Sequence, residues 1–274
     1  MIVEAPEEMP VVAVEEEVRS KDGTRIGFVR FGSGPAIVFV HGSLSTHGDW
    51  FQVAKSLASQ FTCILMDRRG HGLSSDGSAV YSIEHEYDDI ATVLEVAGTG
   101  TSLVAHSFGA TCALGGAMRA PVAKMVLYEP PLSVGGPIAG KALDDYCRAV
   151  NAEHLEEALE IGMKEFVGLP PAQIAAMRRS SIWPKLTALV PTWPRELEEM
   201  DGLGRNVDGY SRIASPTLLL VGSESAHHPF KDSIAALARI LPHVQVATLQ
   251  GQSHMALRLA PQAVTQQIAF FLSQ

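Results

Sequence analysis

One serine in this chain has the neighbours that a catalytic nucleophile requires. Residues 100–109 read Gly-Thr-Ser-Leu-Val-Ala-His-Ser-Phe-Gly, and the run from Ser102 to Ala105 is typical of the end of a buried strand. An Ala/Gly-rich helix is expected to begin near Gly109, which puts Ser107 on a sharp strand-to-helix turn. Such a turn exposes the hydroxyl above a sheet and admits only small residues two positions away, here Ala105 and Gly109. The pattern therefore predicts a nucleophilic Ser107, with Ala105 where glycine is more usual.

A serine hydroxyl needs a base, and the base needs a carboxylate that orients it. His254 lies in Gly-Gln-Ser-His-Met, directly after the last expected strand, and is our prediction for the base. Glu224 follows the expected strand 217–221 and precedes the histidine by 30 residues, so that the chain order is serine, acid, histidine. We predict Glu224 as the acid. Glu129, which ends the preceding strand, is the alternative.

Acyl transfer also needs hydrogen-bond donors for the oxyanion that forms on the substrate carbonyl. The backbone N–H of Phe108, at the start of the new helix, is one predicted donor, and that of Ser43 is the other. Ser43 follows a strand over 36–40 in the sequence His41-Gly42-Ser43. Gly42 allows this loop to approach the substrate closely, and His41 orders the loop by hydrogen bonding, so we place both at the substrate-binding site.

The elements that must position these residues follow from the apolar periodicity. Apolar runs predict eight strands. The first two are joined by an Asp-Gly turn, and helical segments separate the strands from the third onward. The expected strands are 17–21, 24–31, 36–40, 62–66, 102–105, 125–127, 217–221 and 244–249. This alternation is typical of an α/β fold with a mostly parallel, doubly wound sheet and an antiparallel start. Ligands bind beyond the carboxyl ends of such strands, where the predicted site residues lie.

One long segment interrupts the alternation. Residues 132–212 contain proline-punctuated helical pieces and lie between two expected strands, so we predict a helical cap over the strand ends. Trp183 in this segment is predicted to line the substrate pocket. The chain is then one domain over residues 1–274, with its core at 15–131 and 213–274 and an acidic lead-in at 1–14.

Composition excludes several classes of protein. The net charge of −9 disfavours binding to nucleic acid. Residues 1–17 contain six glutamates and no Lys or Arg, unlike a signal peptide, and no apolar run approaches the roughly 20 residues of a membrane span. The three cysteines do not suggest a disulfide framework, and His227-His228 has no partner at metal-ligand spacing. We therefore predict a cytoplasmic protein with a small-molecule substrate, no metal and no cofactor.

Taken in order, several motifs of this chain resemble those of the α/β-hydrolase superfamily. They are His41-Gly42, the stretch Asp-Arg-Arg-Gly-His-Gly-Leu-Ser at 67–74, the turn around Ser107, Glu-Pro-Pro at 129–131 and Gly-Gln-Ser-His at 251–254. The resemblance spans nearly the whole chain and implies a Ser-acid-His triad and a helical cap. Many members have Asp where this chain has Ser225, whereas Glu224 matches a subgroup with a similar Gly-Ser-Glu-Ser sequence.

The function predicted from these features is hydrolysis of a small carboxylic ester, thioester or lactone through an acyl-serine intermediate. Two alternatives remain open. One is a C–C bond hydrolase or lyase, or a perhydrolase, that uses the same triad. The other is a ligand-binding protein with an idle triad, because a fold alone does not determine function.

Overall fold

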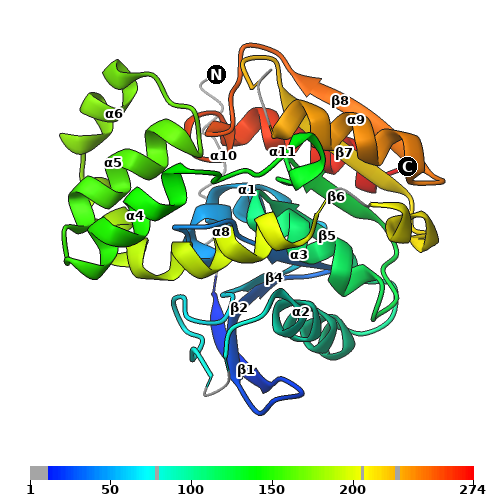
Figure 1. The fold of residues 1–274 in the computed structure, drawn as a ribbon. Coiled ribbons are helices and arrows are strands. Elements are labelled where there is room, and N and C mark those ends of the chain that lie inside the picture. Colours follow the sequence, from blue (N-terminus) through cyan, green and yellow to red (C-terminus); the bar gives the residue numbers. More distant parts are fainter. Residues whose placement is uncertain (1–11, 78–79, 205–206, 226–228) are drawn as a thin grey trace, which may run out of the picture.

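The computed structural model of the chain describes residues 12–77, 80–204, 207–225 and 229–274. Eight strands form one sheet, in the spatial order β1-β2-β4-β3-β5-β6-β7-β8 (Figure 1). The strands are β1 (Val14–Arg19), β2 (Arg25–Gly32), β3 (Ala36–Val40), β4 (Thr62–Met66), β5 (Ser102–His106), β6 (Met125–Tyr128), β7 (Thr217–Gly222) and β8 (Val244–Leu249).

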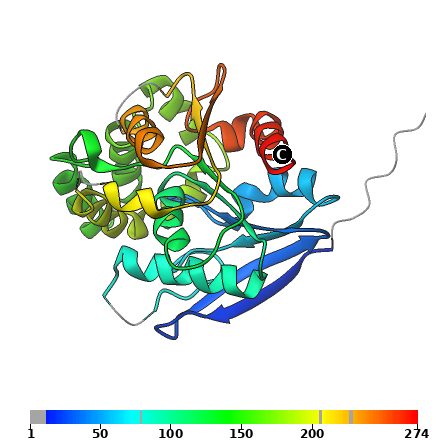
Figure 2. The ribbon, with the colours of Figure 1, turned by 90° about the vertical axis from the view of Figure 1, so that its right-hand side faces the viewer.

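The strand directions confirm the predicted architecture. β2 pairs antiparallel with both β1 and β4, and every other neighbouring pair is parallel. The predicted Asp-Gly turn joins β1 to β2, with Gly23 at φ 84° and its N–H donating to the Ser20 carbonyl. β1 begins at Val14, three residues earlier than expected. In the view of Figure 2, β1 and β2 form the lower edge of the sheet.

Helices cover both faces of the sheet because its central strands are apolar on both sides. Val38 and Val40 of β3 enter one hydrophobic core, and Ile37 and Phe39 enter the other, as the twofold alternation of a strand requires. The first core is covered by α2 (Ile83–Ala97), α3 (Phe108–Ala117) and α9 (Phe230–Ile240). The second is covered by α1 (Phe51–Leu57) and α11 (Pro261–Leu272), with α10 (Ala256–Leu259) and the 3-10 turn η1 (His47–Trp50) nearby.

The segment between β6 and β7 is helical, and its helices gather at one end of the sheet (Figure 1). We call the five α-helices of this segment the inserted helices: α4 (Ala142–Asn151), α5 (Leu155–Glu165), α6 (Pro171–Arg178), α7 (Trp183–Leu189) and α8 (Trp193–Gly202). The 3-10 turns η2 (Ser133–Gly135), η3 (Val190–Thr192) and η4 (Asp208–Arg212) accompany them.

An aromatic cluster holds the inserted helices together. The rings of Tyr146, Phe166 and Trp193 meet edge to face, with centroids 5.4–5.6 Å apart. Within the part of the chain that the structure describes, no helix is long and apolar enough to cross a membrane.

Candidate active site

The structure places Ser107 on the predicted turn between β5 and α3. Its backbone has φ 53° and ψ −133°, a conformation that non-glycine residues rarely adopt, and its N–H donates to the Tyr128 carbonyl at 2.9 Å. A Cβ on Gly109 would lie 2.1 Å from the His41 carbonyl oxygen, so the turn requires a small residue there. Ala105 is fully buried, which shows that this site accommodates a methyl group.

His254 lies within hydrogen-bond distance of the Ser107 hydroxyl. Nε2 of the imidazole is 3.0 Å from Oγ of Ser107, and Nδ1 is 2.6 Å from Oε2 of Glu129. The carboxylate accepts the Nδ1 proton, which leaves the lone pair of Nε2 for the serine proton. His254 comes from the loop between β8 and α10, as the sequence predicts, and is almost completely buried.

The carboxylate that contacts His254 is Glu129, and the prediction that Glu224 occupies this position is wrong. Glu129 is fully buried at the end of β6, and its Oε1 accepts the N–H of Gly222 at 2.7 Å. Glu224 is exposed, and its carboxylate lies 3.5 Å from the Ser223 hydroxyl. The sheet order explains the difference, because β6 is the immediate neighbour of β5 whereas β7 is one strand further away.

Three strand ends at this edge have backbones in the left-handed region. Leu44 after β3, Ser107 after β5 and Glu129 after β6 have φ values of 50°, 53° and 48°. Non-glycine residues adopt such values at a cost in free energy, and strained backbone of this kind gathers at functional sites. The sequence offers no signal for the strain at Leu44 or Glu129.

The two residues predicted to supply the oxyanion hole are close to Ser107 in the chain or in space. Phe108 is the first residue of α3, so its N–H has no acceptor within the helix. Ser43 follows Gly42, where an added Cβ would lie 2.8 Å from Cβ of Ser107 and 3.4 Å from its Oγ. Any side chain at residue 42 would clash with Ser107, so the close approach of this loop requires glycine there. Neither N–H donates to an acceptor among the described residues.

Two residues for which the sequence predicted no role in the site hold His254 in place. Phe230 stacks on the imidazole, with centroids 4.2 Å apart and ring planes 15° apart. The centroid of the His106 ring lies 4.6 Å from that of His254, and its Nε2–H donates to the His254 carbonyl at 3.1 Å. Burial holds the pKa of His106 well below its usual value, so His106 is a neutral donor.

Ser107 and His254 open onto a cavity of about 780 Å³, part of which is open to solvent. Most of the residues in its wall are apolar, and six of these lie in the inserted helices or directly follow one: Met163, Phe166, Leu186, Trp193, Leu197 and Met200. One end of the wall is polar. There Arg258 pairs with Asp49 at 2.6 Å, and the Ser45 hydroxyl donates to the same carboxylate.

The three residues predicted to bind substrate do not line this cavity. His41 is fully buried, where its Nδ1–H donates to the Gly42 carbonyl at 2.8 Å and its Nε2 accepts the Arg68 N–H at 3.0 Å. Gly42 packs against Ser107 instead. Trp183 is buried among the inserted helices, whereas Trp193 is the tryptophan in the wall. The aromatic wall thus comes from the predicted segment, but the choice of tryptophan was wrong.

Among the described residues there is no group of three or more His, Cys, Asp or Glu side chains that could hold a metal ion. His227 and His228 lie outside the described residues.

Comparison with known proteins assigns the chain and its fold to one family. A model of the alpha/beta hydrolase family matches residues 37–267. The 2-(acetamidomethylene)succinate hydrolase of Mesorhizobium japonicum is 26% identical over 250 residues, covering 88% of this chain and 89% of that protein. A non-heme haloperoxidase of Rhodococcus erythropolis is 26% identical over 255 residues, covering 86% of this chain and 92% of that protein.

A solved structure agrees over nearly the whole chain. An alpha/beta hydrolase from Sphaerobacter thermophilus superposes with a TM-score of 0.83 at 30% identity, covering 94% of this chain and 100% of that one. The sequence match and the shared eight-stranded sheet lead to the same conclusion: this chain belongs to the alpha/beta hydrolase family.

Proposed function

We propose that this protein is a serine hydrolase that cleaves small, largely apolar carboxylic esters, thioesters or lactones. One observation carries the proposal. The contacts from Ser107 through His254 to Glu129 form an unbroken chain, and the hydroxyl at its end faces a cavity with a mostly apolar wall.

The proposed reaction has two halves. Oγ of Ser107 attacks the substrate carbonyl while Nε2 of His254 takes the hydroxyl proton, and the N–H groups of Ser43 and Phe108 stabilise the oxyanion. The imidazolium then gives its proton to the leaving alcohol or thiol, which leaves an acyl-serine. Water, deprotonated by His254, attacks the acyl carbonyl and releases the acid, and Ser107 recovers its proton. Buried Glu129 stabilises the imidazolium and orients its ring.

The mostly apolar lining of the cavity favours an apolar substrate. The relative from M. japonicum is named for a succinate, which carries two carboxylates. Arg258 is the cation in the cavity wall among the residues that the structure describes, and Asp49 already pairs with it through both Nε and Nη2. A dicarboxylate would therefore have to compete with Asp49 for this cation, whereas an aliphatic or aromatic group finds a matching wall.

A bifunctional esterase/perhydrolase of Acinetobacter calcoaceticus, 36% identical over 131 residues, raises a second candidate, perhydrolysis. In that reaction hydrogen peroxide replaces water in the second half, and the acyl-serine is released as a peracid. The attacking species alone distinguishes the two reactions, so the same variants test both.

The test is hydrolysis of p-nitrophenyl esters of two to eight acyl carbons by the wild type and by Ser107→Ala, with and without peroxide. A fluorophosphonate probe followed by mass spectrometry reports on the same serine without a substrate. Turnover and a stoichiometric adduct on Ser107, both lost in the variant, are the expected results. A folded wild type that neither turns over esters nor takes the probe would favour the ligand-binding alternative.

A further inference from the structure

A carboxylate of the inserted helices reaches into the core beside the active site. Glu196 lies in the first turn of α8 and is fully buried. It pairs with the guanidinium of Arg68, a residue of the loop that follows β4, which is also fully buried. The proposed mechanism uses neither residue.

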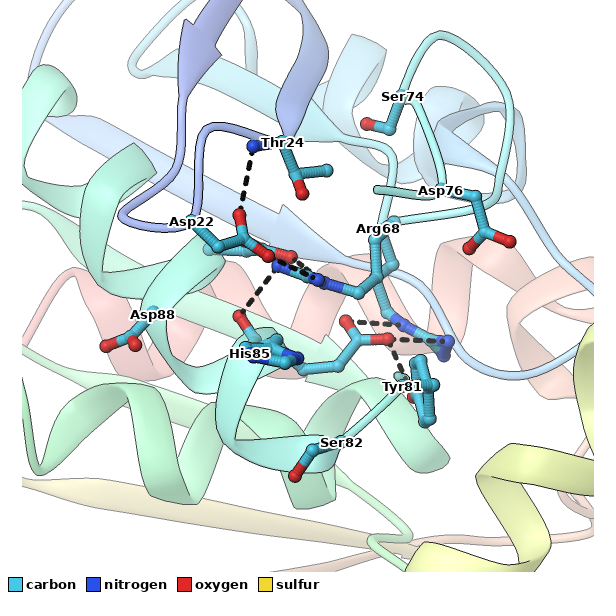
Figure 3. A network of polar contacts seen from close by, with 12 residues as sticks. Asp22, Thr24, Arg68, Ser74, Asp76, Tyr81, Ser82, His85 and Asp88 are labelled. Carbon is cyan, nitrogen blue, oxygen red and sulfur yellow. Dashed lines mark hydrogen bonds and ion pairs between the residues drawn. The ribbon is translucent and has the colours of Figure 1, made fainter. Parts of the chain in front are cut away.

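Arg68 is held on its other side by α2. Its Nε and Nη2 lie 3.4 and 3.3 Å from the two carboxylate oxygens of Glu86, and the Tyr81 hydroxyl donates to Glu86 at 2.9 Å. Figure 3 shows Arg68 and Tyr81 converging on this point. One buried cation thus stands between two buried carboxylates.

Both residues of the proposed oxyanion hole contact this pair of charges. The Arg68 guanidinium lies 4.7 Å from the centroid of the Phe108 ring, a cation–π distance. The Ser43 hydroxyl lies near Glu196 and lowers the pKa of that carboxyl. Oε2 of Glu196 is buried and has no hydrogen-bond partner among the described residues, so it is the carboxylate oxygen that can accept from the Ser43 hydroxyl.

The charges around Glu196 do not balance when it is ionised. Burial raises its pKa to about 7, since Arg68 offsets only one of two neighbouring carboxylates. The titratable and charged groups that face it are Arg68 and His71 of the loop after β4, Glu86 of α2, Tyr81 before α2, Cys112 of α3, Tyr146 of α4 and Arg195 of α8 itself.

We propose that ionised Glu196 is a positioning residue for the oxyanion hole, acting on Ser43 through its hydroxyl and on Phe108 through Arg68. This inference rests on the proposed function, because it concerns the donors of the same reaction. The proposed role also couples the inserted helices to the chemical step, because the carboxylate that positions the two N–H donors belongs to α8 and not to the sheet.

The chain offers a matched control on the same helix. Arg195, next to Glu196, pairs with Asp76 at 2.6 and 2.9 Å, which ties α8 to the same loop near the surface. Asp76 contacts neither Ser43 nor Phe108 in the structure. Asp76→Asn therefore weakens the attachment of α8 and leaves the proposed positioning contacts intact.

The experiment compares ester hydrolysis by the wild type, Glu196→Gln, Asp76→Asn and Ser107→Ala between pH 5.5 and 8.5. For Glu196→Gln we expect kcat about tenfold lower above pH 8, with KM within about threefold, because misplaced donors act on the transition state. The ratio of wild-type to variant kcat should fall toward one below pH 6, where wild-type Glu196 is protonated. Effects of pH that the two proteins share cancel in the ratio. Asp76→Asn should keep the wild-type kcat above pH 8, where Glu196 is ionised in both proteins.

A second variant gives an independent check. Ser43→Ala keeps the backbone N–H and removes the hydroxyl, so its kcat should fall like that of Glu196→Gln, and the double variant should fall little further than either. A kcat ratio that stays constant with pH, or equal losses in Glu196→Gln and Asp76→Asn, would overturn the positioning role. Failure of the proposed function looks different, since the wild type would then be no more active than Ser107→Ala.

Discussion

The imidazole Nδ1 of His254 lies 2.6 Å from Oε2 of Glu129, although 125 residues separate them in the chain. Hydrogen bonds hold both the side chain and the backbone of Glu129. Its Oε1 accepts the Gly222 N–H, and its own backbone N–H donates to the Leu220 carbonyl of the next strand. Glu129 thus reaches the histidine from a position set by β7, which makes the orientation of His254 depend on three neighbouring strands.

This contact predicts that Glu129→Gln severely impairs catalysis. An amide keeps the shape of the side chain but can favour the wrong imidazole tautomer and cannot offset the imidazolium charge, so kcat should fall by about 10³–10⁴ with little change in KM. Glu224→Gln is the matched control, because Glu224 is exposed, and its kcat should stay within about twofold of the wild type. Steady-state ester hydrolysis at pH 7.5 measures both. Equal losses in the two variants would contradict the assignment.

Sequence periodicity predicted the sheet, its order of secondary structure and the turn at Ser107, because each depends on local residue pattern. The choice between Glu129 and Glu224 depends instead on which strand lies next to β5, a tertiary property. One local signal was available. A glutamate one residue after the wholly apolar run Met125–Leu127 is expected to be buried, and a buried carboxylate needs a partner.

A second prediction concerns the neighbour of the nucleophile. His106 donates from Nε2 to the His254 carbonyl, and its ring packs against those of Tyr128 and His254. His106→Phe keeps the ring contacts and removes the donor, so the His254 loop should loosen and kcat should fall about three- to tenfold. Tyr128→Phe removes the other donor to this loop, the hydroxyl that binds the Ser253 carbonyl. We expect the double variant to be slower than either single one, and full activity in both single variants would show that the loop needs neither donor.

A third prediction uses a glycine of the inserted helices to reshape the cavity. A Cβ on Gly162 would lie 2.3 Å from the ring of Trp193, which forms part of the cavity wall. Gly162→Ala should therefore push this indole into the cavity and raise KM for octanoyl esters by about tenfold, with acetyl esters unaffected. Gly202→Ala on α8 is the control, since a Cβ added there would meet no atom within 4 Å. A chain-length profile shared by both variants would mean that Trp193 does not limit the acyl site.

The sequence does not specify which tryptophan lines the cavity, and the reason is physical. Trp183 and Trp193 lie in the same segment with similar surroundings in the sequence, and both are buried. Which of them faces the cavity depends on how α7 and α8 rotate about their axes when they pack on α4 and α5, and local pattern does not specify that rotation.

The last prediction concerns stability and follows from the raised pKa of Glu196. Its carboxyl titrates near 4.5 in the unfolded chain and at about 7 in the folded protein, so the folded state holds the proton more tightly. The stabilisation is complete below pH 4.5 and is lost as pH rises to 7 and beyond, by an amount on the order of 3 kcal/mol. Glu196→Gln cannot ionise and lacks this loss. Urea unfolding at pH 5 and pH 8 should show the wild type losing stability relative to Glu196→Gln across this range. A difference that stays constant, or a wild type that gains stability relative to the variant as pH rises, would mean that Glu196 remains ionised at pH 5 and that Arg68 stabilises it more strongly than burial opposes it.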